Sequence, residues 1–337
     1  MVALTLGALL AAAPVGLARV PADLGDEGSS STSAPEPPPM VRERGRPRIL
    51  DGTVVTDIGS RIRGASYIAY YNCANNDPAS WSLASLAEWG PAYGLNAVRV
   101  FVPPRTQHCA GGADAAPLID RLVRETAKDG LYIILVPGGD GDGSTLAPEL
   151  QAFWEFYAPR YKDHTHVIYE IKNEPEYAPG YPPDVIRMEI DLWNTIRSLA
   201  PDSMILAWSP GAFIGHDSSI LRDLSRGVGV DYSNTAVAVH DYCYRDVSSG
   251  CVDDMGGTVS TVRRAGYPLI VTEFYSCHSA ASMGSYISHF EELGVAWTVF
   301  RFPGNGDPND DCAINSAFQN DVNSGRITWT PDYRKVP

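Results

Sequence analysis

The chain has 337 residues, with 40 acidic against 26 basic side chains and a formal net charge of −14. This acidic balance argues against nucleic acid and anionic membranes as partners, because both attract basic surfaces. We therefore expect no nucleic-acid partner and no stable membrane insertion.

The N-terminus has the composition of an export signal. Residues 2–18 are almost wholly apolar and small, and Gly16-Leu17-Ala18 offers a cleavage site. No Lys or Arg precedes this run, which leaves the true start open. The run is too short and too rich in Ala and Gly for a membrane span. We predict a signal peptide over residues 1–18 and a secreted, extracellular protein.

A Pro/Ser-rich segment over residues 19–46 follows, and we expect it to be disordered because it offers too little apolar surface to fold. We predict one folded domain over residues 47–337, about 290 residues, which is the size of a single α/β barrel. Near its start, Asp51-Gly52 lies between two apolar runs, which predicts a β-hairpin that caps the bottom of the barrel.

Beyond residue 60, short β-branched runs alternate with helical stretches such as 183–200 and 280–293. The predicted strands are 62–70, 97–102, 132–136, 167–171, 204–208, 236–240, 269–272 and 295–300. This alternation predicts a single-domain (β/α)₈ TIM barrel. An open doubly wound sheet is the alternative, but no Gly-rich dinucleotide motif follows the first strand. The glycines of residues 138–143 lack the Lys-Ser/Thr of a phosphate-binding loop, so we interpret them as a flexible loop.

Six cysteines, an even number, fit an exported protein. All of them follow predicted strands, at the loop face of the barrel. Neighbouring loops suggest disulfides that staple these loops, although the sequence does not fix the connectivity. The suggested pairs are Cys73 with Cys109, Cys243 with Cys251, and Cys277 with Cys312. Reduced, buried thiols are the alternative.

Two glutamates end predicted strands. Glu174 lies in Asn173-Glu174-Pro175 after the fourth strand, and Glu273 closes the seventh. A parallel barrel gathers its strand ends at one face, where active sites are built. Two carboxylates from separate strands can therefore meet across one cleft, and paired carboxylates are the machinery of glycoside hydrolysis.

Four motifs in this order resemble family 5 of the glycoside hydrolases, or a close relative in the same retaining (β/α)₈ clan, over about residues 63–302. They are Gly94-Leu95-Asn96-Ala97-Val98-Arg99, Asn173-Glu174-Pro175, His240-Asp241-Tyr242 and Thr272-Glu273-Phe274. Each motif alone has an ordinary structural explanation, such as a strand-to-turn corner or a structural histidine whose hydrogen bonds are met by neighbouring groups. Their order at successive strand ends gives the resemblance its weight. It implies that Glu174 is the acid/base and Glu273 the nucleophile.

The supporting residues follow from the same resemblance. Arg99 can hold Glu273 ionised through a charge-assisted hydrogen bond, and a structural ion pair inside the barrel is the alternative. The resemblance implies that Tyr242 bonds the nucleophile and that His240 lines the sugar site. Asn173 would donate to the sugar 2-hydroxyl. Adjacent strand residues point to opposite faces, so the strand must bulge or end before Asn173 and Glu174 can both reach the cleft.

An aromatic sugar platform is expected at the end of the eighth strand, where relatives carry a tryptophan. Trp297 and Phe300 both fit this place, and we favour Trp297. Asn72 and Tyr275, in loops after the first and seventh strands, are further candidates to line the cleft. The third strand ends without the histidine of many relatives. His108, in a neighbouring loop, is a candidate substitute.

Two other short segments could indicate a different chemistry. His164-Thr165-His166 suggests a metal site, but it precedes a strand and we expect no further ligand near it. Cys277-His278 suggests a thiol nucleophile, but the even cysteine count favours a disulfide. We predict neither metal nor cofactor.

The function predicted from these features is that of a secreted, monomeric, retaining β-glycosidase. It would cleave internal bonds of a β-linked oligo- or polysaccharide, of the endoglucanase or mannanase type. An exo-acting or glycolipid-directed β-glycosidase, and a sugar-binding barrel without turnover, are the alternatives.

Overall fold

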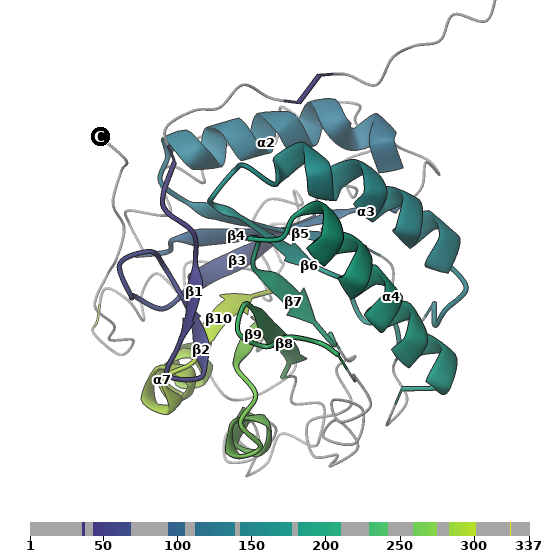
Figure 1. Cartoon of the computed structure of the whole chain (residues 1–337). Helices are drawn as coiled ribbons and strands as arrows, with labels where there is room; N and C mark the ends of the chain where they lie inside the picture. Colours follow the sequence, from purple (N-terminus) through teal and green to yellow (C-terminus); the bar gives the residue numbers. More distant parts are fainter. Residues whose placement is uncertain are drawn as a thin grey trace, which may run out of the picture. The chain divides into compact units, whose positions relative to one another are not determined.

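The computed structural model describes residues 36–37, 43–68, 94–104, 112–138, 142–176, 181–209, 229–241, 259–274, 283–300 and 324. Eight parallel strands form the centre of the fold (Figure 1). They are β3 (Arg63–Ile68), β4 (Ala97–Val102), β5 (Tyr132–Pro137), β6 (Val167–Glu170), β7 (Ile205–Ala207), β8 (Thr235–His240), β9 (Leu269–Glu273) and β10 (Ala296–Val299). They pair in chain order, and β10 also pairs with β3, which closes the barrel. The (β/α)₈ prediction is confirmed, with the strands placed to within a residue or two.

Helices cover the outside of the barrel, because parallel strands are apolar on both faces and need a second layer (Figure 1). The described helices include η2 (Gly112–Ala115), α2 (Ala116–Lys128), α3 (Ala147–Tyr161), α4 (Pro183–Leu199) and α7 (Met283–Leu293), and residues 259–264 are also helical. Three of them, α2 to α4, carry a proline in the first turn, where its fixed φ suits the helix and its missing N–H costs nothing.

The interior of the barrel is filled by a separate apolar cluster of small and large side chains, which includes Ala97, Ile134, Ile168 and Ala238. The hairpin of β1 (Arg48–Leu50) and β2 (Thr53–Val55) closes its lower end. The cluster contains Val54, which is fully buried, and Thr53 pairs with Leu269 at the start of β9. Asp51 and Gly52 both have positive φ, as the predicted two-residue turn requires.

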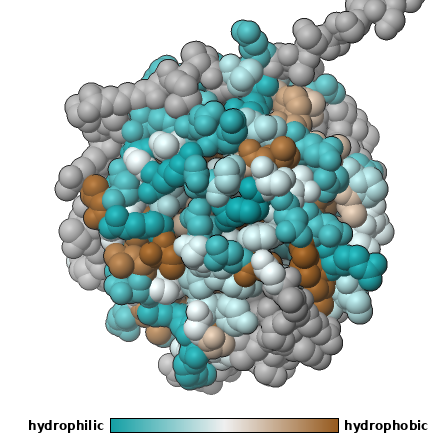
Figure 2. All heavy atoms as spheres, in the orientation of Figure 1, coloured by the Kyte–Doolittle hydropathy of each residue, from teal (hydrophilic) through white to brown (hydrophobic). Residues whose placement is uncertain are grey.

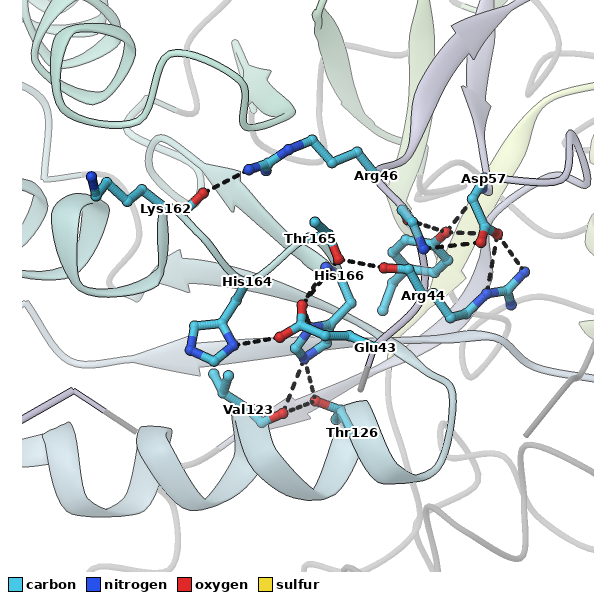
Figure 3. A network of polar contacts seen from close by, with 12 residues as sticks. Glu43, Arg44, Arg46, Asp57, Val123, Thr126, Lys162, His164, Thr165 and His166 are labelled. Atoms are coloured by element: carbon cyan, nitrogen blue, oxygen red, sulfur yellow. Dashed lines mark hydrogen bonds and ion pairs between the residues drawn. The ribbon is translucent and has the colours of Figure 1, made fainter. Parts of the chain in front are cut away.

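At this lower end, residues 43–46 pack against the barrel (Figure 3). Glu43 accepts hydrogen bonds from His164 Nδ1 at 2.6 Å and from His166 Nδ1 at 2.8 Å. Nearby, the Arg44 guanidinium pairs with Asp57 at 2.9 Å. The folded domain therefore includes these four residues, which the sequence assigns to the disordered segment.

The Glu43 cluster corrects one expectation, since a third potential metal ligand does lie beside His164 and His166. The contacts of 2.6 and 2.8 Å have the length of hydrogen bonds. Ligand atoms about 2.1 Å from one zinc ion in a tetrahedron would lie roughly 3.4 Å apart. His166 Nε2 lies 3.0 Å from the Val123 carbonyl oxygen. Both ring nitrogens of His166 thus lie within hydrogen-bond distance of protein oxygens.

The described surface is mostly polar. Figure 2 shows hydrophilic side chains over much of this face, interrupted by separate brown patches. Large hydrophobic side chains that are clearly exposed among the described residues are Leu50 and Ile58, both near the hairpin. Within the described part of the chain, no helix has the length and apolar character needed to cross a bilayer.

The first prediction concerns the Glu43 cluster. Burial opposes ionisation of Glu43, but the hydrogen bonds from His164 and His166 outweigh it and lower its pKa below the usual 4.5. The stability from this carboxylate is thus fully present above pH 4.5 and is lost as the pH falls through the folded pKa. Glu43→Gln should cost on the order of 1–3 kcal/mol of unfolding free energy at pH 7, and the deficit should shrink below about pH 4.

Denaturant unfolding at pH 7 and at pH 3.5 measures both values. Glu125→Gln is the matched control, because Glu125 pairs with Lys128 at the surface of α2, where such pairs contribute little. Equal stability of the Glu43 and Glu125 variants at pH 7 would contradict the prediction.

Candidate active site

A buried arginine organises the upper end of the barrel. Arg99 on β4 is fully buried, and its Nε and Nη2 donate to the Glu170 carboxylate at 2.6 and 2.7 Å. Its Nη1 donates to Glu273 Oε1 at 2.5 Å. Its Nη2 also donates to Asn173 Oδ1 at 2.8 Å. One guanidinium thus fixes side chains from β6, from the segment after β6, and from β9.

The two predicted catalytic carboxylates lie beside each other. His240, the last residue of β8, donates from Nδ1 to Glu174 Oε1 at 2.6 Å, and the same nitrogen lies 3.7 Å from Glu273 Oε2. A carboxylate oxygen of Glu174 and one of Glu273 lie within 4.8 Å of each other. Retaining glycosidases hold their carboxyl groups about 5–5.5 Å apart, whereas inverting enzymes leave roughly 6.5–9.5 Å for a water molecule. The limit of 4.8 Å on this oxygen pair is closer to the retaining range than to the inverting one.

The corner at Asn173 and Glu174 lets two adjacent side chains reach the same group of buried residues. Strand β6 ends at Glu170, and Glu174 has a φ of +37°. This left-handed conformation is unfavourable for a residue with a Cβ. The expectation that the strand must end before these residues is confirmed, because Asn173 reaches Arg99 while Glu174 reaches His240.

Electrostatics favour a charged His240. Burial alone would lower the pKa of His240, but the negative charges of Glu273 and Glu174 outweigh burial, so its pKa is raised. The hydrogen bond to Glu174 acts in the same direction. Glu174, His240 and Glu273 include atoms of the kinds that bind metals. Here, however, Arg99 bonds Glu273 and the His240 imidazole bonds Glu174, both at hydrogen-bond distance.

Glu170 is a site residue that the sequence analysis missed. It is fully buried, binds Arg99 through both oxygens and accepts a hydrogen bond from Ser209 Oγ. Its signal was a glutamate inside the apolar run Val167-Ile168-Tyr169-Glu170-Ile171. An acidic side chain buried in a barrel strand needs a cation nearby, and Arg99 on β4, two strands away from Glu170, was the candidate.

The preference for Trp297 as the sugar platform is wrong. Trp297 is fully buried and points away from the barrel interior, where its ring packs edge-on against Phe274. Its Nε1 donates to Glu291 on α7 at 2.8 Å, and Arg61 and Arg63 pair with the same carboxylate.

Phe300, the alternative, lies beyond the end of β10 and is partly exposed. Its ring contacts Phe101 edge-on at 6.1 Å between centroids. The Arg99 guanidinium in turn lies 4.4 Å from the centre of the Phe101 ring. Phe300 is therefore the aromatic side chain of this pair that borders the Arg99 site.

Several predicted residues cannot be placed. Asn72, Tyr242, Tyr275 and His108 lie outside the described residues, as do all six cysteines and their suggested disulfides.

A second buried acid supports the same region from α4. Glu189 is fully buried, and its Oε2 accepts from the backbone N–H of Trp208 at 3.3 Å. Trp208 has a φ of +63° and precedes Ser209, the donor to Glu170. Burial raises the pKa of Glu189 to about 8, although the Trp208 N–H and the charge of Lys172 oppose this rise.

Similar proteins were found by family, by sequence and by structure. The family model "Cellulase (glycosyl hydrolase family 5)" matches residues 70–306. Endoglucanase N of Pectobacterium atrosepticum is 26% identical over 209 residues, which cover 60% of this chain and 44% of that protein. An endoglucanase of Clostridium saccharobutylicum is 21% identical over 193 residues, which cover 53% of this chain and 40% of that protein. The chain thus spans less than half the length of these curated relatives.

Solved structures share the fold. A β-glucanase of Saccharophagus degradans in complex with cellotetraose superposes with a TM-score of 0.65 at 19% identity, covering 86% of this chain and 98% of that one. The catalytic domain of a mannanase from Streptomyces sp. SirexAA-E gives a TM-score of 0.60 at 20% identity, covering 85% and 89% of the two chains. Both resemblances concern the barrel itself.

The second prediction concerns Glu189. A carboxyl group whose pKa rises from 4.5 to about 8 on folding makes the protein less stable as the pH rises between those values. Glu189→Gln removes the ionisation and keeps an amide oxygen for the Trp208 N–H. We expect the unfolding free energy of the variant, relative to the native protein, to increase from pH 5 to pH 8 by at most a few kcal/mol. A difference in unfolding free energy between the two proteins that stays constant from pH 5 to pH 8 would contradict the raised pKa of Glu189.

Proposed function

The chain belongs to glycosyl hydrolase family 5, and we propose that it is a retaining β-glycosidase that cleaves internal bonds of a β-linked glucan or mannan. The observation that carries the proposal is the close approach of Glu174 and Glu273, with Arg99 bonded to the second of them. Endoglucanases among the relatives, and fold neighbours that include a β-glucanase with cellotetraose and a mannanase, support this substrate class.

The proposed mechanism uses two displacements. Glu273 attacks the anomeric carbon, while Glu174 gives its proton to the departing glycosidic oxygen. Arg99 keeps the Glu273 carboxylate oriented, since one of its oxygens is held at 2.5 Å. In the second step Glu174 takes a proton from water, which attacks the glycosyl-enzyme and releases Glu273. The product keeps the β configuration.

Asn173 and Phe300 are the proposed sugar contacts. Because Arg99 binds the Asn173 oxygen, the group that Asn173 turns to a sugar is its amide nitrogen, a donor suited to the 2-hydroxyl. Phe300 offers an aromatic face to the apolar C–H side of a pyranose ring.

The remaining expectations belong to the same proposal. Residues 1–18 are proposed as a signal peptide of a secreted monomer, with a segment from residue 19 that leads into the catalytic domain. The loop disulfides are proposed as predicted from the sequence. An exo-acting or glycolipid-directed enzyme would share the two carboxylates, and product analysis on polymer, oligosaccharide and glycolipid substrates separates these possibilities.

The third prediction separates the two carboxylates. Glu174→Ala should nearly abolish hydrolysis of substrates with poor leaving groups and should spare glycosylation by a dinitrophenyl glycoside, whose leaving group needs no proton. Azide should then restore turnover and give a β-glycosyl azide. Glu273→Ala lacks the nucleophile, so its double displacement should not recover with any leaving group. A β-glycosyl azide formed by the Glu273 variant instead would reverse the two roles.

The fourth prediction concerns the platform. Phe300→Ala should raise KM for an oligosaccharide by about 2- to 10-fold, the loss expected for one aromatic contact of ~0.5–1.5 kcal/mol. Trp297→Phe should instead lower the melting temperature with little change in KM, because Trp297 is buried and bonded to Glu291. Steady-state kinetics and thermal unfolding of both variants test this contrast. A larger KM effect from Trp297→Phe would restore Trp297 as the platform.

A further inference from the structure

A lysine is buried directly before the proposed catalytic corner. Lys172 is fully buried, and its Nζ donates to the carbonyl oxygen of Asn173 at 2.9 Å. It also donates to the Gly138 carbonyl oxygen at 3.3 Å and lies 3.6 Å from Asp142 Oδ2. Burying an ammonium group is costly unless acceptors and an opposite charge compensate, and this site supplies both. We call Lys172, Asn173, Gly138 and Asp142 the Lys172 clamp.

The clamp joins two loops at the upper end of the barrel. Gly138 and Asp142 lie in the segment after β5, whereas Asn173 belongs to the corner after β6. Backbone bonds run between the same segments, from the Asn173 N–H to the Pro137 carbonyl at 3.1 Å. A second bond runs from the Gly143 N–H to the Pro175 carbonyl at 2.7 Å. The Lys172 ammonium group adds a charged contact that links the same two segments.

The carbonyl of Asn173 is the decisive atom. It belongs to the peptide plane that joins Asn173 to Glu174, and the orientation of this plane sets the φ angle of Glu174. That angle is +37°, in the left-handed region that is unfavourable for a residue with a Cβ. Such a conformation persists only where the surroundings hold it. Lys172, which is fully buried, holds this plane through its hydrogen bond to the Asn173 carbonyl.

We propose that Lys172 is a positioning residue for the acid/base Glu174. By fixing the Asn173–Glu174 peptide plane and tying it to the loop after β5, it keeps the Glu174 carboxyl directed at the leaving-group oxygen. This inference rests on the proposed function. The described contacts of Lys172 are with backbone carbonyls and with Asp142, so its effect should appear in proton donation rather than in nucleophilic attack.

The test compares leaving groups in the full-length protein. Lys172→Met keeps the length and apolar stem of the side chain and removes the charge and donors. We expect kcat/KM for a glycoside with a poor leaving group to fall at least about 10-fold, a fraction of the usual contribution of general acid catalysis. For the dinitrophenyl glycoside we expect a change of less than about 3-fold, because that step needs no proton. Lys162→Met is the matched control, since Lys162 is exposed after α3, and it should change neither value.

A uniform loss on both substrates would overturn the proposal, because it would indicate general disruption, and so would no loss on either. Asp142→Asn provides a second variant if Lys172→Met does not fold, since Asp142 is partly exposed and its change leaves Lys172 in place. Asp142→Asn should also lower kcat/KM for the poor leaving group relative to kcat/KM for the dinitrophenyl glycoside, by a smaller factor than Lys172→Met. If the ratio of these two values does not change, the proposal is overturned. Glu174→Ala, measured alongside, separates the two hypotheses. If that variant shows no dependence on the leaving group, the proposed function fails; if it does and Lys172→Met does not, only the role of Lys172 fails.

Discussion

The buried Arg99 guanidinium is the interaction on which the upper end of this barrel depends. It bonds Glu170, Glu273 and Asn173 at 2.5 to 2.8 Å, with its side chain fully buried. Burying a guanidinium is unfavourable unless carboxylates surround it, and these carboxylates would be equally unfavourable without it. Burial alone would lower the pKa of Arg99, yet Glu170 and Glu273 raise it above its usual value. The arginine and its partners therefore stabilise one another as a unit.

The backbone is strained at Glu174 and at Trp208 because side chains there must reach the site around Arg99. Side chains in a regular strand alternate between the two faces, so a barrel strand alone cannot aim two consecutive residues at one site. Glu174 and Trp208 both adopt positive φ just beyond their strands. At the first corner the Glu174 side chain bonds His240, and after the second corner Ser209 bonds Glu170. Buried polar groups, Lys172 beneath the first corner and Glu189 beneath the second, bond the backbone there. Backbone strain and buried polar groups thus occur together because the chain must leave the regular strand geometry to bring these side chains to one site.

The sequence predicted the barrel well because β-branched runs recur at a regular spacing and parallel strands need no exact side-chain partner to form. It predicted that Glu174 and Glu273 meet because strand ends converge, and the resemblance to family 5 added Arg99 and His240. It could not decide between Trp297 and Phe300, since a shift of one residue in the strand reverses which side chain faces outward. It missed Glu43 beside His164 and His166, because that contact joins segments more than 100 residues apart and Glu43 lies in a stretch whose composition indicates disorder.

The charges of the site fit the reaction proposed for it. His240 Nδ1 lies 2.6 Å from Glu174 and 3.7 Å from Glu273, and its Nε2 lies 4.0 Å from Glu170. Three acidic side chains therefore lie around two basic ones, Arg99 and His240, which is an excess of one acidic group in a buried site. A transition state of oxocarbenium character is positive, so this excess stabilises it more than the neutral sugar. The proton in the short bond between His240 and Glu174 leaves this balance unchanged whichever of the two groups carries it.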